Sequence, residues 1–196
     1  GEPLPMGTVG KDFGFYAEWM DQHGINRRHI KVCEDTYTAQ AFITTDMDDN
    51  QITAFHPGAM NRSHETRVSD ANGVKLGIVS PDGREGMIQH ARQFAEAGIP
   101  FIFDPGQGMP LFDSDDLMAF IEQATWVTLN YSEAELMQDT IQRDVIGLLL
   151  ALAEGKVSAI RLPDVVEQGR VAPVEVRRLG GPVVHLGVDV DRVLAA

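Results

Sequence analysis

The chain has 196 residues with 29 acidic and 16 basic side chains, so its formal charge at neutral pH is −13. This charge disfavours nucleic acids and anionic membranes as partners, because both are bound chiefly through lysine and arginine. One cysteine cannot form an internal disulfide bond, and the chain has neither an 18-residue apolar stretch nor a recognisable leader, so we expect a soluble, cytoplasmic protein.

The first predicted elements are a strand, a helix and a second strand. Residues 4–9 form a short apolar run that ends in a glycine turn, which is typical of a strand. Residues 12–23 carry large apolar side chains at helical spacing, and Gly24 follows at the position where glycine ends many helices. Residues 30–32 predict the next strand. The apolar side chains of the predicted helix are Phe15, Trp19 and Met20.

A β-hairpin is predicted over residues 38–56. Residues 38–44 and 51–56 are rich in β-branched and aromatic residues, and the polar run 45–50 between them is typical of a turn. The three aspartates of that run lack the ligand spacing and the glycine of a calcium-binding loop, so we interpret them as part of a solvated turn.

From Val74 onward, strands alternate with amphipathic helices, which implies a parallel sheet with right-handed crossovers and hence an α/β fold. The predicted strands are residues 76–79, 99–103 and 126–129. The predicted helices are residues 84–97, a helix with its N-cap at Ser114, and residues 132–138. The side chains expected to face the core are Met87, Ile88, Ala91, Phe94, Leu117, Phe120 and Ile121.

Polar residues follow each of these three strands. Residues 80–82 come after the first strand, residues 104–106 after the second and residues 130–133 after the third. Because ligands of open parallel sheets bind at the carboxyl ends of the strands, we expect a binding site at this edge.

The composition changes after Asp139. Residues 1–139 hold nine basic and 22 acidic residues, all 14 aromatic residues and all eight methionines, whereas residues 140–196 hold seven basic and seven acidic residues. We therefore divide the chain into a core and a compositionally distinct C-terminal segment, for which a divergent subdomain and a different origin are both open interpretations. The elements predicted in this segment are a helix at residues 145–154 and strands at residues 157–162, 171–176 and 183–186.

Several familiar catalytic motifs are absent. The chain has no GxxxxGK[ST] phosphate loop, no GxGxxG dinucleotide fingerprint, no HExxH zinc motif and no GxSxG nucleophile elbow. One cysteine and six scattered histidines do not make a thiolate zinc site. Any catalytic function must therefore use other residues.

Four segments resemble, in order and spacing, motifs of the ribokinase or PfkB family of carbohydrate and nucleoside kinases. They are GTVGKDFG at residues 7–14, PGAM at residues 57–60, FDP at residues 103–105 and LNYSE at residues 129–133, which contains the family's N-x-x-E pattern. The resemblance covers about residues 1–139. Within the family, the chain looks most similar to bacterial members described as adenosine or carbohydrate kinases.

The resemblance implies a ribokinase-like three-layer α/β sandwich with a mainly parallel central sheet and a small β lid at about residues 38–56. We expect the sandwich to be incomplete, because the family's first strand would precede Gly1 and its GAGD segment has no clear counterpart. The implied reaction transfers the γ-phosphoryl group of ATP to a hydroxyl group of a sugar or nucleoside, with Mg²⁺ as a cofactor.

The resemblance also implies roles for individual residues. Asn130 and Glu133 would lie near the phosphates and magnesium and act largely through water, although their positions at a strand end and a helix N-terminus also fit a purely structural role. The segment GVDVD at residues 187–191 stands in place of GAGD. There Asp191, with Asp189 as the alternative, would take the proton of the attacking hydroxyl group, although both also fit surface positions.

Substrate contacts are expected from two sides. Ser80, Asp82 and Asp104 lie at the predicted strand ends, and Gln40 and Phe42 lie on the predicted lid. As alternatives, Asp82 begins a turn and Phe42 packs against neighbouring side chains.

Two hypotheses of function follow. The first is an ATP- and Mg²⁺-dependent kinase that acts on a small molecule such as adenosine or ribose. The second is a catalytically inactive or truncated kinase-like fold that acts as a binding or dimerisation module, because the segment for the catalytic base is not recognisable. The exposed edge of the hairpin favours a homodimer formed through the lid. We expect neither nucleic acid nor membrane as a partner.

Overall fold

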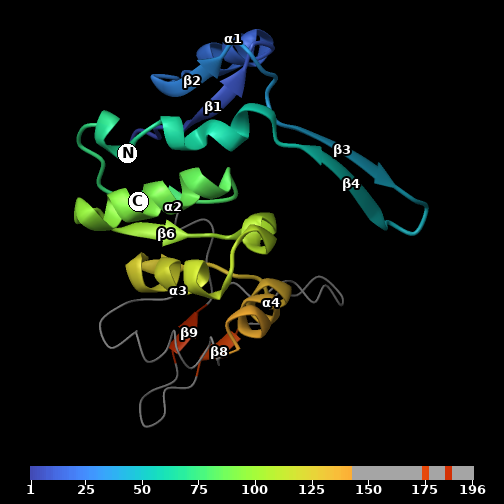
Figure 1. The fold of residues 1–196 in the computed structure, drawn as a ribbon, viewed down its shortest axis with the longest axis vertical. Helices are drawn as coiled ribbons and strands as arrows, with labels where there is room; N and C mark the ends of the chain where they lie inside the picture. Colours follow the sequence, from blue (N-terminus) through green and yellow to red (C-terminus); the bar gives the residue numbers. More distant parts are fainter. Residues whose placement is uncertain (143–173, 177–183, 187–196) are drawn as a thin grey trace.

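The computed structural model describes residues 1–142, 174–176 and 184–186 (Figure 1). Its strands are β1 (Met6–Gly10), β2 (His29–Cys33), β3 (Gln40–Thr45), β4 (Gln51–His56), β5 (Gly77–Val79), β6 (Phe101–Phe103), β7 (Trp126–Val127), β8 (Val174–Val176) and β9 (Val184–Leu186). Its α-helices are α1 (Gly14–Gln22), α2 (Arg84–Glu96), α3 (Ser114–Gln123) and α4 (Tyr131–Ile141). Its 3₁₀ helices are η1 (Gly58–Glu65), η2 (Val68–Asp70) and η3 (Gly106–Leu111).

The described strands form two parallel ladders and two antiparallel pairs. β1 pairs with β2, and β5, β6 and β7 form a three-stranded ladder in that order. Because α2 and α3 connect the three strands of the second ladder, the predicted α/β fold with parallel strands is confirmed. Within the described ranges, no strand pairs with both ladders. In Figure 1, η1 lies between β1 and α2, and it contacts both.

The main core lies between the β5–β7 ladder and the helices α2, α3 and α4. The rings of Phe103 and Phe120 stack with their centroids 4.3 Å apart, and Leu117 is fully buried beside them. All the side chains that helical spacing predicts for this core are buried, apart from Ile88, which is half-buried at its edge. The predicted apolar faces of α2 and α3 are therefore confirmed.

The helix α1 is confirmed, but its predicted apolar face is only partly buried. Met20 is buried, whereas 86% of Phe15 and 41% of Trp19 are exposed. Exposed rings on this helix stack on one another instead: Tyr16 on Trp19 at 5.4 Å between centroids, and Trp19 on His23 at 4.1 Å. The reason is that no described element covers this outer face of α1. Helical spacing predicts which side chains share a face, but not whether another layer covers it.

Two helix boundaries refine the sequence prediction. The helix α1 ends at Gln22 with His23 as its C-cap, and Gly24 follows with φ +66°, as the C-terminal glycine predicts. The N-cap of α3 is Asp113 and not Ser114, because the extended backbone of Asp113 lets its Oδ1 accept a hydrogen bond of 2.9 Å from the N–H of Asp116. The predicted N-cap at Ser114 is thus wrong by one residue.

Nothing in the sequence pattern predicted the 3₁₀ helix η1, which follows the hairpin directly. Of the elements predicted after Asp139, residues 145–154 and 157–162 lie outside the described residues. Strands β8 and β9 correspond to the predictions at residues 171–176 and 183–186, and they pair antiparallel with each other. Among the described helices, none combines the length and the apolar character that spanning a bilayer requires.

Candidate functional site

The carboxyl ends of β5, β6 and β7 lie side by side. In the ladder register Val79 lies opposite Phe103, and Phe103 opposite Val127. The N–H of Asp104 donates a 2.9 Å hydrogen bond to the carbonyl of Val79, and the N–H of Thr128 donates one of equal length to the carbonyl of Phe103. The polar segments that begin at residues 80, 104 and 128 therefore share one edge of the sheet.

The loops after β5 and β6 are in direct contact. A Cβ atom on Gly106 would lie 2.7 Å from Cγ of Pro81, so only glycine fits at this position without displacing the proline ring. Gly106 also has φ +45°, which glycine adopts without strain. The contact holds Ser80 and Asp82 on the same side of the sheet as Asp104.

Asp82 is the most perturbed carboxyl group at this edge. Burial raises the pKa of Asp82, and the N–H of Gly83 and the His90 imidazole oppose this rise in part. The N–H of Gly83 donates a 2.7 Å hydrogen bond to Asp82 Oδ1. Asp82 thus both begins the turn into α2, as one interpretation of the sequence predicts, and presents a half-buried carboxyl group at the edge.

Asn130 and Glu133 form a reciprocal cap at the start of α4. The N–H of Glu133 donates to Asn130 Oδ1 (2.8 Å), and the N–H of Asn130 donates to Glu133 Oε2 (2.9 Å). The amide Nδ2 of Asn130 also donates to Glu133 Oε1 (2.7 Å). The structural role that the sequence allowed for this pair is therefore confirmed.

The hydrogen bonds of the cap leave Asn130 and Glu133 little remaining capacity to bind a cation. Each carboxylate oxygen of Glu133 accepts one of these hydrogen bonds and keeps a further lone pair. In the described part of the chain, no three Asp, Glu, His or Cys side chains gather into a metal site. These donors fit Mg²⁺, which commonly retains several waters and uses one or two carboxylates together with substrate phosphates.

The predicted lid is an antiparallel hairpin whose base is tied to Asp12. Asp12 Oδ1 accepts hydrogen bonds from the N–H (2.8 Å) and Oγ1 (2.7 Å) of Thr38, and these bonds lower the pKa of Asp12. The amide of Gln40 donates to Asp12 Oδ2 at 3.3 Å. Sequence reasoning did not propose Asp12 as a functional residue, although it lies in the segment of residues 7–14 that carries the family resemblance.

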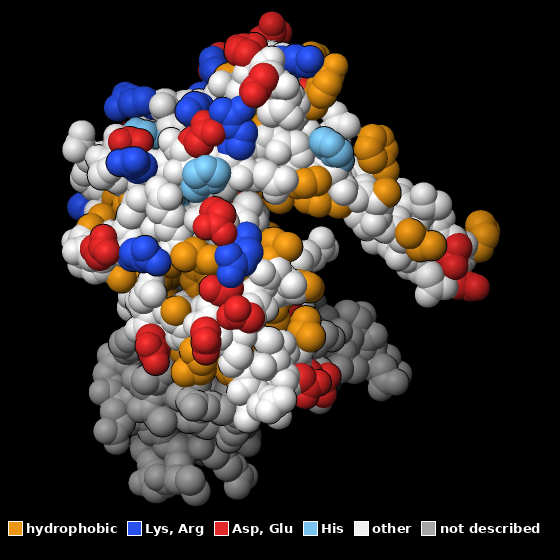
Figure 2. Space-filling view, in the orientation of Figure 1, with side chains coloured by type: hydrophobic (Ala, Val, Ile, Leu, Met, Phe, Trp, Pro, Cys, Tyr) orange, Lys and Arg blue, Asp and Glu red, His pale blue; other side chains and the backbone are white. Residues whose placement is uncertain are grey.

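The hairpin strands β3 and β4 are exposed along their whole length. Phe42 lies opposite Ala54 and exposes 63% of its surface, so it does not pack as one interpretation of the sequence expected. Figure 2 shows the hairpin as an arm beside a hollow in the molecular surface, and in Figure 1 it leaves the body on the side to which β6 points. The arm and the strand ends thus lie on the same side.

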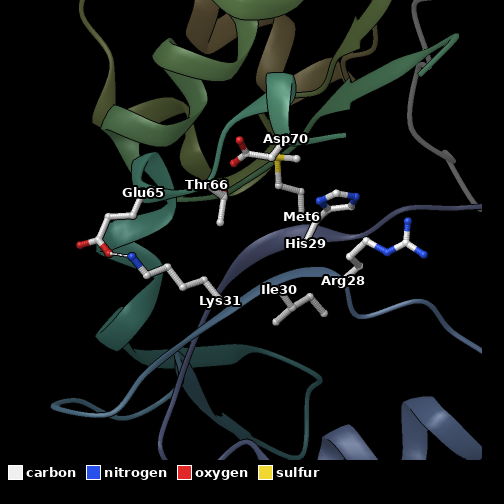
Figure 3. Close-up of a pocket in the computed structure, with 8 residues that line it drawn as sticks. All are labelled: Met6, Arg28, His29, Ile30, Lys31, Glu65, Thr66 and Asp70. Carbon is white, nitrogen blue, oxygen red and sulfur yellow. Dashed lines mark ion pairs between the residues drawn. The ribbon is translucent and has the colours of Figure 1, made fainter. Parts of the chain in front are cut away.

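A cavity of about 190 Å³ lies elsewhere, at the amino ends of β1 and β2 (Figure 3). Two of its charged side chains form an ion pair: Lys31 Nζ lies 2.6 Å from Glu65 Oε2, and Arg62 and Lys31 lower the pKa of Glu65 to about 2. The side chains that line it are Met6, Arg28, His29, Ile30, Lys31, Glu65, Thr66 and Asp70, and none is a predicted site residue.

The predicted site residues thus fall into three groups. Ser80, Asp82 and Asp104 lie at the edge with the Asn130–Glu133 pair, and Gln40 and Phe42 lie on the arm. Asp189 and Asp191 lie outside the described residues. Thr128 is a further polar residue that sequence reasoning missed: its Oγ1 is buried at this edge and has no hydrogen-bond partner among the described residues.

A family model and two curated relatives that match this chain all describe kinases. The model of the family described as pfkB family carbohydrate kinase matches residues 4–161. The nucleoside kinase of Methanocaldococcus jannaschii is 26% identical over 142 residues, which make up 71% of this chain and 46% of that protein. The nucleoside kinase of Methanothermobacter thermautotrophicus is 27% identical over 150 residues, which make up 73% of this chain and 48% of that protein.

Solved structures match in the same way. The structure of Burkholderia thailandensis nucleoside kinase in complex with inosine is 51% identical in sequence, with a TM-score of 0.70, over 73% of this chain and 48% of that one. The Methanocaldococcus jannaschii nucleoside kinase, described as an archaeal member of the ribokinase family, gives a TM-score of 0.66 at 26% identity, over 74% of this chain and 48% of that one. The ribokinase-like fold is thereby shown. The chain spans about half the length of the relatives it matches.

Proposed function

Because the chain belongs to the pfkB family of carbohydrate kinases, we propose that it serves the transfer of the γ-phosphoryl group of ATP to a hydroxyl group of a nucleoside. The observation that carries this proposal is the shared edge of β5, β6 and β7, where three polar segments lie on the side from which the hairpin projects. The likeness to a nucleoside kinase solved with inosine supports a purine nucleoside over a free sugar as the acceptor.

The acceptor would lie between the edge and the arm. The carboxyl groups of Asp82 and Asp104 and the hydroxyl of Ser80 suit hydrogen bonds with ribose hydroxyl groups, which are both donors and acceptors. Gln40 and Phe42 share one face of the hairpin, because residues two apart in a strand point the same way. In this proposal Phe42 offers its exposed ring to the base and Gln40 offers its amide.

The phosphates of ATP would lie toward α4. Asn130 and Glu133 keep acceptor capacity there for waters of a magnesium ion, which when bound neutralises phosphate charge. We assign the removal of the acceptor's proton to Asp191, with Asp189 as the alternative. The single cysteine supports a reducing compartment, so the cytoplasm is the proposed location.

The test is ATP turnover, coupled to ADP detection, with inosine, adenosine, ribose and fructose as acceptors. We expect turnover with at least one of the two nucleosides. The variant Asp191→Asn is expected to lower kcat about 100-fold or more, because general-base catalysis commonly contributes that much. Asp189→Asn is the parallel variant, because a loss of kcat there and not in Asp191→Asn would assign the role of base to Asp189. A folded protein that turns over none of the four acceptors would refute the proposal.

The hairpin favours a second candidate function, a binding or dimerisation module. An isolated two-stranded hairpin is marginally stable in water, and the hairpin exposes five large apolar side chains. These are Phe42, Ile43, Met47, Ile52 and Phe55. Cross-strand pairing puts Phe42 and Ile52 on one face and Ile43 and Phe55 on the other, so one face can cover an acceptor while the other meets a second copy.

Analytical ultracentrifugation tests this dimer. We expect a concentration-dependent dimer that Ile43→Asp converts to a monomer, because a buried unpaired carboxylate is costly at an interface. Ile52→Asp on the opposite face is the matched control and should leave the dimer intact. A monomer at all concentrations excludes dimerisation through the lid.

A further inference from the structure

The segment that leads from the hairpin back to the sheet packs against the first turn of α2 with very little space between them. Ser63 in η1 is fully buried. A Cβ atom on Gly86 would overlap Oγ of Ser63 and lie 2.8 Å from its Cβ, closer than Cβ atoms normally approach other atoms. A Cβ atom on Gly83 would overlap the carbonyl oxygen of Met60. Both glycines are therefore required by the close approach of η1 to α2.

Three side chains of α2 hold the end of this segment by its backbone. The bonds run from Gln89 Nε2 to the carbonyl of His64 (3.1 Å), between His90 Nε2 and the carbonyl of Thr66 (2.9 Å), and from the N–H of Val68 to Gln93 Oε1 (2.7 Å). His90 is buried, so its bond is shielded from water. Residues 63–68 are thus fixed along one side of α2.

The other end of η1 is fixed to the base of the hairpin. The N–H of Ala59 donates a 2.8 Å hydrogen bond to the carbonyl of Tyr37, the residue from which the hairpin departs. The carbonyl of Ala59 accepts a buried 2.6 Å bond from Thr8 Oγ1 in β1. η1 therefore runs as a continuous support from the hairpin base to α2, as Figure 1 shows.

The residues just before α2 belong to the candidate site. Asp82 precedes Gly83, which is the N-cap of α2, and Ser63 Oγ lies only 2.9 Å from the position that a Cβ atom on Gly83 would take. A shift of η1 relative to α2 would therefore change the distance between the hairpin and Asp82. Asn130 and Glu133 are attached to neither of these elements, because they lie at the start of α4 beyond β6 and β7.

We propose that Ser63 is a positioning residue that, through its contact with Gly86, sets the spacing between the hairpin base and Asp82 and so the affinity for the nucleoside acceptor. The identity of the acceptor as a nucleoside rests on the proposed function, whereas the contact between Ser63 and Gly86 is independent of it. A change at Ser63 or Gly86 should then act on the KM of the acceptor and leave the KM of ATP and kcat nearly unchanged.

A size exchange at this contact is the test. Gly86→Ala inserts a methyl group where the Ser63 hydroxyl lies, and it is expected to raise the KM of inosine about tenfold, the scale of overpacking a tight contact. Ser63→Gly opens that space and should raise the same KM by about threefold. The double variant Ser63→Gly/Gly86→Ala should return the KM of inosine to within about twofold of the wild-type value. Gly14→Ala is the matched control, because nothing lies within 4 Å of its Cβ position.

Hydrogen exchange of the same variants gives a readout that needs no activity. In Gly86→Ala, amides at the hairpin base and amides of residues 82–86 should exchange faster together, and the double variant should restore both. Three results would each overturn the inference. The first is faster exchange in α2 alone, and the second is a KM of ATP that rises together with the KM of inosine. The third is a double variant whose KM for inosine stays raised. If the wild-type chain turns over no acceptor, the proposed function fails, and the exchange result alone decides whether Ser63 couples the hairpin to Asp82.

Discussion

The β5–β7 ladder and the region of β1, β2 and η1 differ in what holds them together. The cluster of buried apolar residues extends from Val68 to Ile141 and includes no residue of β1, β2, α1 or the hairpin. The N-terminal region relies more on polar contacts: Glu65 pairs with both Arg62 and Lys31, and Arg62 also pairs with Asp35. Apolar burial stabilises at any pH, whereas these contacts depend on charge. The chain thus joins a sheet that apolar packing stabilises to an N-terminal region in which ion pairs contribute more.

The largest expected effect is a difference in unfolding free energy between a core variant and a variant of the hairpin arm. Leu117→Ala should lower the free energy of unfolding by about 2–5 kcal/mol, because it leaves a cavity in a fully buried site. Phe42→Ala, which removes a larger but exposed side chain, should change it by less than about 0.5 kcal/mol. Urea unfolding followed by the fluorescence of Trp126, in a Trp19→Phe background, measures both. Equal losses would show that the hairpin is part of the core.

The sequence predicted the two regions unequally well, for a physical reason. The strands β5–β7 and the faces of α2 and α3 follow from local apolar periodicity, and the core buries those side chains as expected. Spacing along the chain does not show which distant segments meet. It therefore predicted neither the exposure of the Phe15 and Trp19 rings nor the hydrogen bonds of Thr38 to Asp12. That the polar segments after β5, β6 and β7 gather at one edge was predictable, because parallel strands end together.

A smaller effect distinguishes two roles of Glu133, the cap of α4 and the proposed role near phosphates and magnesium. Glu133→Ala should lower the free energy of unfolding by about 1 kcal/mol, because it removes half of the reciprocal cap of α4. Glu133→Gln should retain most of that stability, since its amide oxygen can still accept the hydrogen bond from the N–H of Asn130. If Glu133 also serves phosphates and magnesium, both variants should lower ATP turnover at least about tenfold.

Urea unfolding and coupled turnover, measured on the same preparations, check this pair. A glutamine variant with full turnover would leave Glu133 a structural cap only. A glutamine variant as unstable as the alanine variant would show that the charge of Glu133, and not its hydrogen bond, stabilises α4.

The smallest expected effect is an acid sensitivity confined to the N-terminal region. Arg62 and Lys31 lower the pKa of Glu65 from 4.5 to about 2 in the folded chain. Because the folded pKa is depressed, the stability that Glu65 contributes is complete above about pH 4.5 and is lost as the pH falls toward 2. Partly exposed ion pairs contribute little each, so the change should be small and weaker at high salt. Glu65→Gln should remove this dependence and leave the stability below about pH 2 nearly unchanged.

The two tryptophans allow each region to be followed separately. Trp19 lies in α1 and Trp126 in β7, so Trp126→Phe and Trp19→Phe backgrounds report the N-terminal region and the β5–β7 ladder, respectively. Between pH 5 and 3, the midpoint of unfolding seen by Trp19 should fall more than that seen by Trp126, and Glu65→Gln should narrow the difference. Arg84→Gln is the matched control, because it removes the ion pair of Arg84 with Asp116 on the ladder side. If both probes shift equally with pH, the two regions unfold as one cooperative unit, and the contacts of η1 with α2 are strong enough to join them.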